Sequence, residues 1–210
     1  MMSVDVKVKQ VPHEVAQKFA RELLKVLIRN RTLLFCVGDL EDVASVVGLP
    51  EGVDVYDIVD VLDEKLSSVE LAVVDDKGDD PCFMIVPASL VEDEKLLDAL
   101  FKLADEDEEI ILRLTAYFLS SCGLATAPKG KTGIALPFVL IAEAWGVVFE
   151  KDYSLFSSRT YTGIIKLCLD DACIYERVYY CNYICSAHGL FKCSEYMFEL
   201  PGEFGDMEES

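Results

Sequence analysis

Five of the eight cysteines and one of the two histidines fall within residues 161–197. On a helix, Cys181, Cys185 and His188 would share one face, and Cys193 would complete a Cys3His zinc site. On a strand, Cys181 and Cys185 would lie four residues apart. At a rise of about 3.3 Å per residue, they would be too far from each other to bind the same ion. The aromatic, β-branched composition favours strand. We therefore expect no cofactor, and keep a zinc-stabilised structural module as an alternative.

Residues 163–180, GIIKLCLDDACIYERVYY, predict an antiparallel β-hairpin. With Asp170 and Asp171 in the turn, Cys168 faces Cys173 at disulfide range. The alternative is a pair of reduced thiols that pack as small apolar residues. Intracellular disulfides are rare outside hyperthermophiles, and the abundance of Val, Ile, Tyr and Glu suits a thermophile. The redox compartment therefore decides between the two states.

Two other segments contain residue types that act on phosphates. Residues 125–132, ATAPKGKT, match a relaxed phosphate-binding loop through Lys131 and Thr132, but the preceding pattern is helical where that motif needs a strand. Asp75, Asp76 and Lys77 follow a predicted strand and resemble the acid-x-Lys order of metal-dependent nucleases. Similar triplets recur elsewhere in this acidic chain. We therefore assign no catalytic residues, and a metal-dependent enzyme acting on nucleotides or nucleic acid is the alternative.

The net charge of −19 is concentrated in one part of the chain. Residues 39–109 contain 23 acidic residues and 4 lysines, whereas residues 1–38 contain 7 basic and 3 acidic residues. Such an acidic segment repels nucleic acid and attracts basic surfaces. The sequence thus predicts a non-enzymatic interaction or regulatory protein that presents an acidic face to a basic protein partner. A nucleic-acid-binding protein is one such partner, and direct binding of nucleic acid by this chain is not expected.

Two charged groups are the predicted interaction residues. A basic stripe follows one face of the helix expected at residues 13–30, and an acidic run ends the helix expected from residue 92. The stripe is either a solvated face or a docking surface for the acidic segment of the same chain or of a second copy, as in a homodimer. The two groups are Lys18, Arg21, Lys25 and Arg29, and Asp105, Glu106, Asp107, Glu108 and Glu109.

Apolar periodicity indicates the elements that position these residues. Residues 134–149 are apolar on almost every side, which predicts a buried central helix. Helices are expected at 13–30, 39–47, 54–68, 92–104 and 110–124, and short strands at 32–38, 70–75 and 82–87. Together with the hairpin, these elements predict an α+β fold, with mixed α/β as the alternative.

The pattern also predicts the organisation of the chain. We expect an acidic α/β lobe at 1–105, a lobe of helices and hairpin at 106–200 and a disordered tail at 201–210, or else one compact domain. The start of the chain lacks an apolar leader pattern, and the longest apolar run is shorter than the about 20 residues that cross a bilayer. We therefore expect a cytoplasmic protein without membrane contact.

Overall fold

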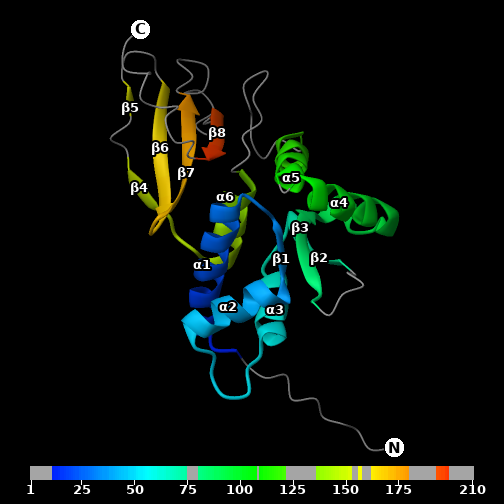
Figure 1. The fold of residues 1–210 in the computed structure, drawn as a ribbon. Helices are drawn as coiled ribbons and strands as arrows, with labels where there is room; N and C mark the ends of the chain where they lie inside the picture. The colour runs from blue at the N-terminus through cyan, green and yellow to red at the C-terminus, as the bar shows by residue number, and fades with distance from the viewer. Residues whose placement is uncertain are drawn as a thin grey trace, which may run out of the picture.

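The structure is a computed structural model, and it describes residues 11–74, 80–107, 109–121, 136–152, 156–157, 162–179 and 193–198. Within these residues there are six α-helices and two antiparallel sheets (Figure 1). Because helices and antiparallel strands occupy separate parts of the fold, the class is α+β, and the prediction of that class is confirmed.

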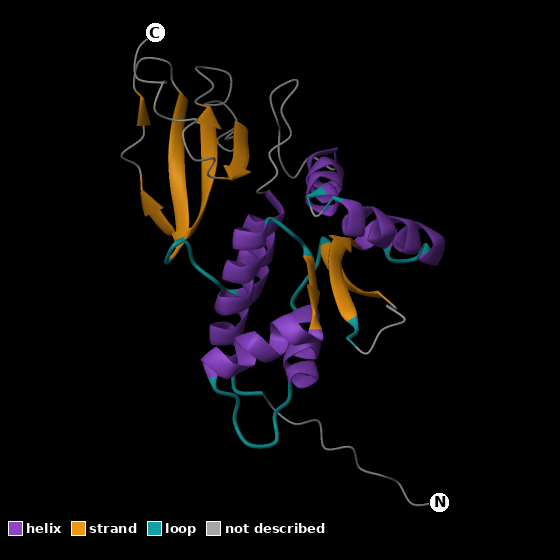
Figure 2. Cartoon of the chain, in the orientation of Figure 1, coloured by secondary structure: helices purple, strands orange, loops and turns teal. Residues whose placement is uncertain are grey.

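The first half of the chain builds a small sheet against three helices. Its elements are α1 (His13–Asn30), β1 (Leu34–Cys36), α2 (Val37–Val47), α3 (Val55–Asp63), β2 (Val69–Val74) and β3 (Cys82–Pro87). The strands are antiparallel and adjacent in the order β1-β3-β2 (Figure 2). The order of elements is therefore helix–strand–helix–helix–strand–strand, in which α2 and α3 follow each other as a helix, a connection and a helix.

Helix α1 lies at the centre of the molecule. Its apolar stripe, which includes Phe19, Leu23 and Leu27, is fully buried and packs against α2, α3 and α6. The helix ends at Arg31, which adopts the left-handed conformation with φ 52°. The predicted bounds of this helix, 13–30, match the structure because the apolar repeat runs uninterrupted between those residues.

Helix α3 is shorter than the helix predicted at 54–68. Asp54 caps its first turn, since its carboxylate accepts a hydrogen bond from the Asp57 N–H at 3.0 Å and Asp57 reciprocates at 2.9 Å. The helix ends at Asp63, whose carboxylate accepts a hydrogen bond from the Leu71 N–H in β2 at 3.2 Å. The residues after Asp63 therefore form the connection to β2 and do not extend the helix.

The second half begins with two further helices and a buried one. These are α4 (Glu94–Glu106), which follows the short 3-10 helix Ala88–Leu90, then α5 (Ile110–Ser121) and α6 (Leu136–Trp145). Helix α6 is the buried helix expected at 134–149, with Pro137 in its first turn. Gly146, at φ 68°, follows its last residue, and the chain continues as an extended segment. The Trp145 indole N–H donates to the Leu62 carbonyl at 3.1 Å, which ties α6 to α3.

The second sheet is antiparallel and has the order β4-β6-β7-β8, with β5 beside β6. Its strands are β4 (Glu150–Asp152), β5 (Phe156–Ser157), β6 (Thr162–Leu169), β7 (Ala172–Tyr179) and β8 (Cys193–Phe198). The register of β6 and β7 places Leu169 opposite Ala172 and Cys168 opposite Cys173, with Asp170 and Asp171 in the turn. This end of the sheet, with Leu169 and Ala172 buried, packs against α1.

Side chains from both sides of residue 105 contribute to one hydrophobic core. The division into lobes at that position remains a prediction, and the tail at 201–210 lies outside the described residues. None of the helices in the described part of the chain has the length and apolar character needed to cross a membrane.

Candidate functional site

The basic stripe of α1 contacts the turn between β6 and β7. The Lys25 ammonium donates to the Asp170 carboxylate at 2.8 Å and also lies 2.6 Å from a Glu22 carboxylate oxygen. The Arg21 guanidinium donates to the other Asp170 oxygen at 3.2 Å. Lys25 is buried, so its charge is compensated where water does not reach it freely.

The remaining cations of the stripe also have partners within the chain. The Arg29 guanidinium pairs with the Asp171 carboxylate. The Lys18 ammonium donates to the Val47 carbonyl, at the last residue of α2, at 2.9 Å. The two interpretations of this stripe were a solvated face and a docking surface for carboxylates of residues 39–109 or of a second copy. The carboxylates that it meets belong instead to the hairpin turn, which the packing of the second sheet brings onto α1.

These contacts shift the ionisation of the groups involved. Hydrogen bonds from Lys25 and then Arg21 lower the pKa of Asp170 below its ordinary value of 3.8. A hydrogen bond from Arg29 lowers the pKa of Asp171 in the same way. Burial disfavours the Lys25 ammonium, but its hydrogen bonds to Asp170 and Glu22 outweigh burial and raise the Lys25 pKa above 10.5. The ionised forms are therefore the stable ones near neutral pH.

The predicted acidic run is divided between solvent and internal contacts. Asp105 and Glu106 are exposed at the end of α4. Glu109 is half-buried, and its carboxylate lies 2.6 Å from the Arg113 guanidinium and 3.4 Å from that of Arg31. Asp107 accepts a hydrogen bond from the Glu109 N–H at 3.1 Å. Glu108 lies outside the described residues, so the acids shown to face solvent without a partner are those at the helix end.

A further group of acidic side chains lies on α2, α3 and their connection. Residues 39–65 contain nine acidic side chains and one lysine, Lys65. Asp39, Asp54, Asp57 and Asp63 hold helix ends or strand backbone through hydrogen bonds. The other five carboxylates are exposed and form no hydrogen bond or ion pair within the described residues. They are Glu41, Asp42, Glu51, Asp60 and Glu64.

Two apolar side chains are exposed among these acids. Val46, near the end of α2, is 66% exposed, and Tyr56, at the start of α3, is 48% exposed. We call the outward side of residues 39–65 the acidic helix-turn-helix face. The exposed carboxylates give this face a negative potential, which repels phosphates and attracts cations.

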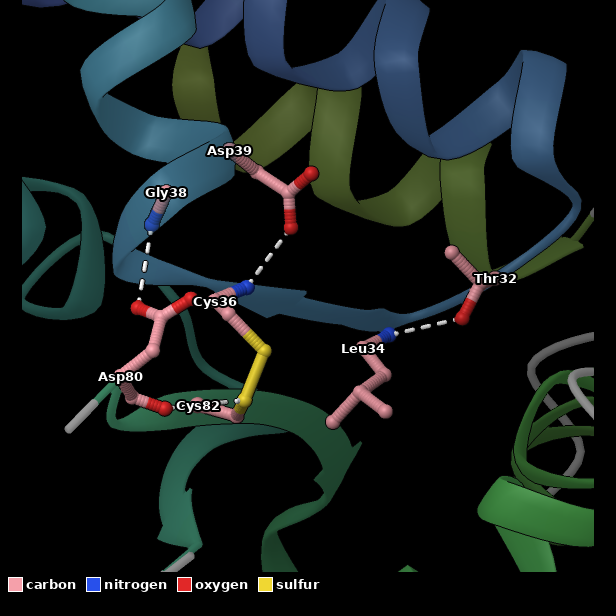
Figure 3. Close-up of a disulfide and its surroundings, with 7 residues drawn as sticks. All are labelled: Thr32, Leu34, Cys36, Gly38, Asp39, Asp80 and Cys82. Carbon is pink, nitrogen blue, oxygen red and sulfur yellow. Dashed lines mark hydrogen bonds between the residues drawn. A yellow bond between two sulfur atoms is a disulfide. The ribbon is translucent and has the colours of Figure 1, made fainter. Parts of the chain in front are cut away.

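Cys36 and Cys82 form a disulfide that the sequence analysis missed (Figure 3). They lie opposite each other in β1 and β3, with their Cα atoms 3.9 Å apart. Beside them, the Asp39 carboxylate accepts from the Cys36 N–H at 2.8 Å and the Asp80 carboxylate accepts from the Gly38 N–H at 3.1 Å. Each of two predicted strands carried one cysteine, and pairing those strands would have identified the bond.

The candidate pair Cys168 and Cys173 is also joined as a disulfide, with Cα atoms 4.2 Å apart. Disulfides persist in oxidising compartments and in the cytosol of hyperthermophiles. A cytoplasmic location therefore agrees with these bonds only if the protein comes from a hyperthermophile. The location stays a prediction.

Several predicted site residues lie outside the described part of the chain. They are the zinc candidates Cys181, Cys185 and His188, the phosphate-loop residues Lys131 and Thr132, and the triplet Asp75, Asp76 and Lys77. Cys193, the fourth zinc candidate, begins β8 opposite Tyr179. In the residues that are described, no three His, Cys, Asp or Glu side chains are grouped so as to hold a metal ion.

No family model, curated protein or solved structure matches this chain. A function must therefore be argued from the surface itself, because the connectivity alone does not specify one.

Proposed function

We propose that this chain is a non-enzymatic interaction protein whose acidic helix-turn-helix face binds a basic protein partner. The observation that carries this proposal is the segregation of charge. The four cations of the α1 stripe bind partners within the chain. By contrast, five exposed carboxylates have no partner within the described residues: Glu41, Asp42, Glu51, Asp60 and Glu64. A partner that uses lysine or arginine to bind nucleic acid has the complementary charge.

The face also contains the apolar contacts that a protein interface needs. Interfaces depend on a few buried anchors, often aromatic, surrounded by polar residues that set orientation and rate of association. Tyr56 offers an aromatic ring on which an arginine side chain stacks, and Val46 offers a small apolar contact. The carboxylates would then supply long-range attraction, and the two apolar side chains would supply short-range contact.

The test uses a poly-lysine peptide and a DNA duplex as probes, each titrated into the protein at several salt concentrations. We expect the peptide to bind at low ionic strength, with a dissociation constant that rises with salt, and the duplex not to bind. The variant Asp60→Asn/Glu64→Gln should weaken peptide binding by about two- to tenfold, as expected for exposed ion pairs. The control Glu143→Gln/Glu150→Gln removes two exposed charges from α6 and β4.

The control variant has the same net charge as the α3 variant but leaves the acidic face intact. Equal weakening by the two variants would mean that overall charge, not this face, drives binding. Absence of peptide binding at low ionic strength would overturn the proposed function.

A further inference from the structure

Strand β2 lies at one edge of the β1-β3-β2 sheet. It pairs with β3 along all six of its residues, from Val69 opposite Pro87 to Val74 opposite Cys82. On its other side no strand of the described part of the chain is paired with it, so β2 is the outer strand of the β1-β3-β2 sheet (Figure 2). An edge of this kind presents backbone N–H and C=O groups to any extended chain that meets it.

The hydrogen bonds of β3 show which residues of β2 point outward. The Ile85 N–H donates to the Leu33 carbonyl at 2.9 Å, on the β1 side, and Ile85 lies opposite Leu71. Backbone groups alternate between the two sides of an antiparallel strand, so Leu71 points away from β3. The hydrogen bond from the Leu71 N–H to the Asp63 carboxylate agrees with this orientation. By the same alternation, the backbone groups of Val73 also point outward.

The accessible part of this edge is its second half. Val69 is buried, whereas the Val73 side chain is 68% exposed. Asp63 accepts the hydrogen bond of one outward N–H, at Leu71. The Leu71 carbonyl and both backbone groups of Val73 have no hydrogen-bond partner within the described residues.

The edge lacks some of the features that prevent pairing with another strand. Lysine, proline and β-bulges block exposed edges in many proteins. Strand β2 reads VELAVV and contains neither lysine nor proline, and its register with β3 is continuous. It therefore combines high β-propensity with free backbone groups.

The charge around the edge indicates which kind of chain would pair with β2. Glu70 lies on β2 itself, and Glu64 follows Asp63, whose carboxylate binds the Leu71 N–H; both glutamates are exposed. A second copy of this chain would bring the same acidic groups, and its net charge of −19, to the pairing. A lysine- or arginine-bearing segment brings opposite charge.

We propose that the edge of β2 at residues 71–74 accepts an extended basic segment of a partner protein as an additional strand. Main-chain hydrogen bonds to Leu71 and Val73 give affinity, and cations on the added strand meet the acids beside it. This proposal rests on the proposed function and specifies how the partner is held.

The test measures binding of a peptide of alternating lysine and valine to the full-length chain. Val73→Pro removes the outward N–H, and proline is tolerated where an edge strand faces solvent. Val73→Thr is the matched control, because it keeps the N–H and the branched side chain. We expect Val73→Pro to weaken binding by about tenfold and Val73→Thr to leave it within about twofold, in line with the loss of one or two hydrogen bonds.

A second peptide keeps the proposal testable if Val73→Pro unfolds the protein. The same lysine–valine sequence with alternate N-methylated amides cannot form the added strand, and we expect it to bind the unmodified protein about tenfold more weakly. If both peptides bind the protein equally, strand addition is overturned and charge-driven association stands. If neither peptide binds at low ionic strength, the proposed function fails as well. Self-association through β2 that Val73→Pro abolishes would assign the edge to a second copy and overturn the basic partner.

Discussion

Asp170 is the residue on which the ionic contact between α1 and the second sheet depends. It adopts the left-handed conformation with φ 56°, which aspartate tolerates better than most side chains. Its two carboxylate oxygens separately accept from Lys25 and Arg21. Because Lys25 is buried, removing Asp170 would leave an ammonium group with Glu22 as its remaining partner. A single turn residue thus pairs with two cations of the central helix.

The depressed pKa of Asp170 predicts a pH dependence of stability. A carboxyl group whose pKa is lower in the folded than in the unfolded state stabilises the fold above its ordinary pKa of 3.8, and this stabilisation is lost as pH falls through the folded pKa. Asp170→Asn should therefore lower the free energy of unfolding at pH 7, and its difference from the unmodified protein should shrink in strong acid. Denaturant unfolding at both pH values measures this.

Asp60→Asn is the control for this pH experiment, because it removes an exposed carboxylate that has no ion pair within the described residues. We expect it to change stability much less than Asp170→Asn at pH 7. A difference between Asp170→Asn and the unmodified protein that stayed constant down to strong acid would contradict the assigned ion pairs.

Among the elements in the described part of the chain, two pairs of strands are joined covalently. Both disulfides connect residues that lie opposite each other in antiparallel strands. The Cys36–Cys82 bond spans 46 residues and encloses α2, α3 and β2, whereas the Cys168–Cys173 bond spans 5 and encloses only the hairpin turn. In the chain-entropy account, a longer closed loop restricts the unfolded chain more.

Removing the two disulfides should therefore have unequal effects. Loop closure predicts a loss of about 4 kcal/mol for Cys36→Ala/Cys82→Ala, whose loop spans 46 residues. For Cys168→Ala/Cys173→Ala, whose loop spans 5, it predicts about 2 kcal/mol. Denaturant unfolding with and without a thiol reductant measures both losses. A larger loss from the hairpin pair would contradict the chain-entropy account here.

Across the whole molecule, α1 and α6 connect the helix-turn-helix unit to the rest of the fold. Helix α1 contacts α2 and α3 on one side and β7 on the other. Helix α6 packs on α1 and, through the indole N–H of Trp145, binds the carbonyl of Leu62 near the end of α3. Contacts with α1 and α6 thus hold in place the two helices that carry the acidic face. A surface held in this way loses little conformational freedom if it binds a partner.

Trp145→Phe tests this anchoring. The change removes the indole N–H and leaves the buried Leu62 carbonyl without its partner, which should cost about 1–3 kcal/mol beyond the lost volume. Ile141→Val on the same helix is the control, with an expected cost of about 0.5–1.5 kcal/mol, because it changes packing alone. Circular dichroism during denaturant unfolding measures both. A cost no greater than that of Ile141→Val would show that the hydrogen bond does not contribute.

Local patterns in the chain were sufficient for the α+β class, for the bounds of α1 and for the location of the acidic charge. Apolar periodicity and residue charge are properties of neighbouring residues, so they can be read without knowledge of the fold. The same patterns predicted a helix longer than α3. The apolar repeat continues to Leu66, although the helix ends at Asp63, whose carboxylate accepts a hydrogen bond from the Leu71 N–H. They also predicted a helix longer than α6, because an apolar run shows that residues are buried but not where a helix ends and an extended segment begins.

Long-range pairing was set by tertiary packing instead. Asp170 lies 145 residues from Lys25, and Cys36 lies 46 residues from Cys82. No local pattern specifies which turn reaches α1, or that β3 lies between β1 and β2, because those outcomes depend on how the apolar faces of distant elements pack together. This packing neutralises the basic stripe and leaves the acidic helix-turn-helix face and the edge of β2 exposed.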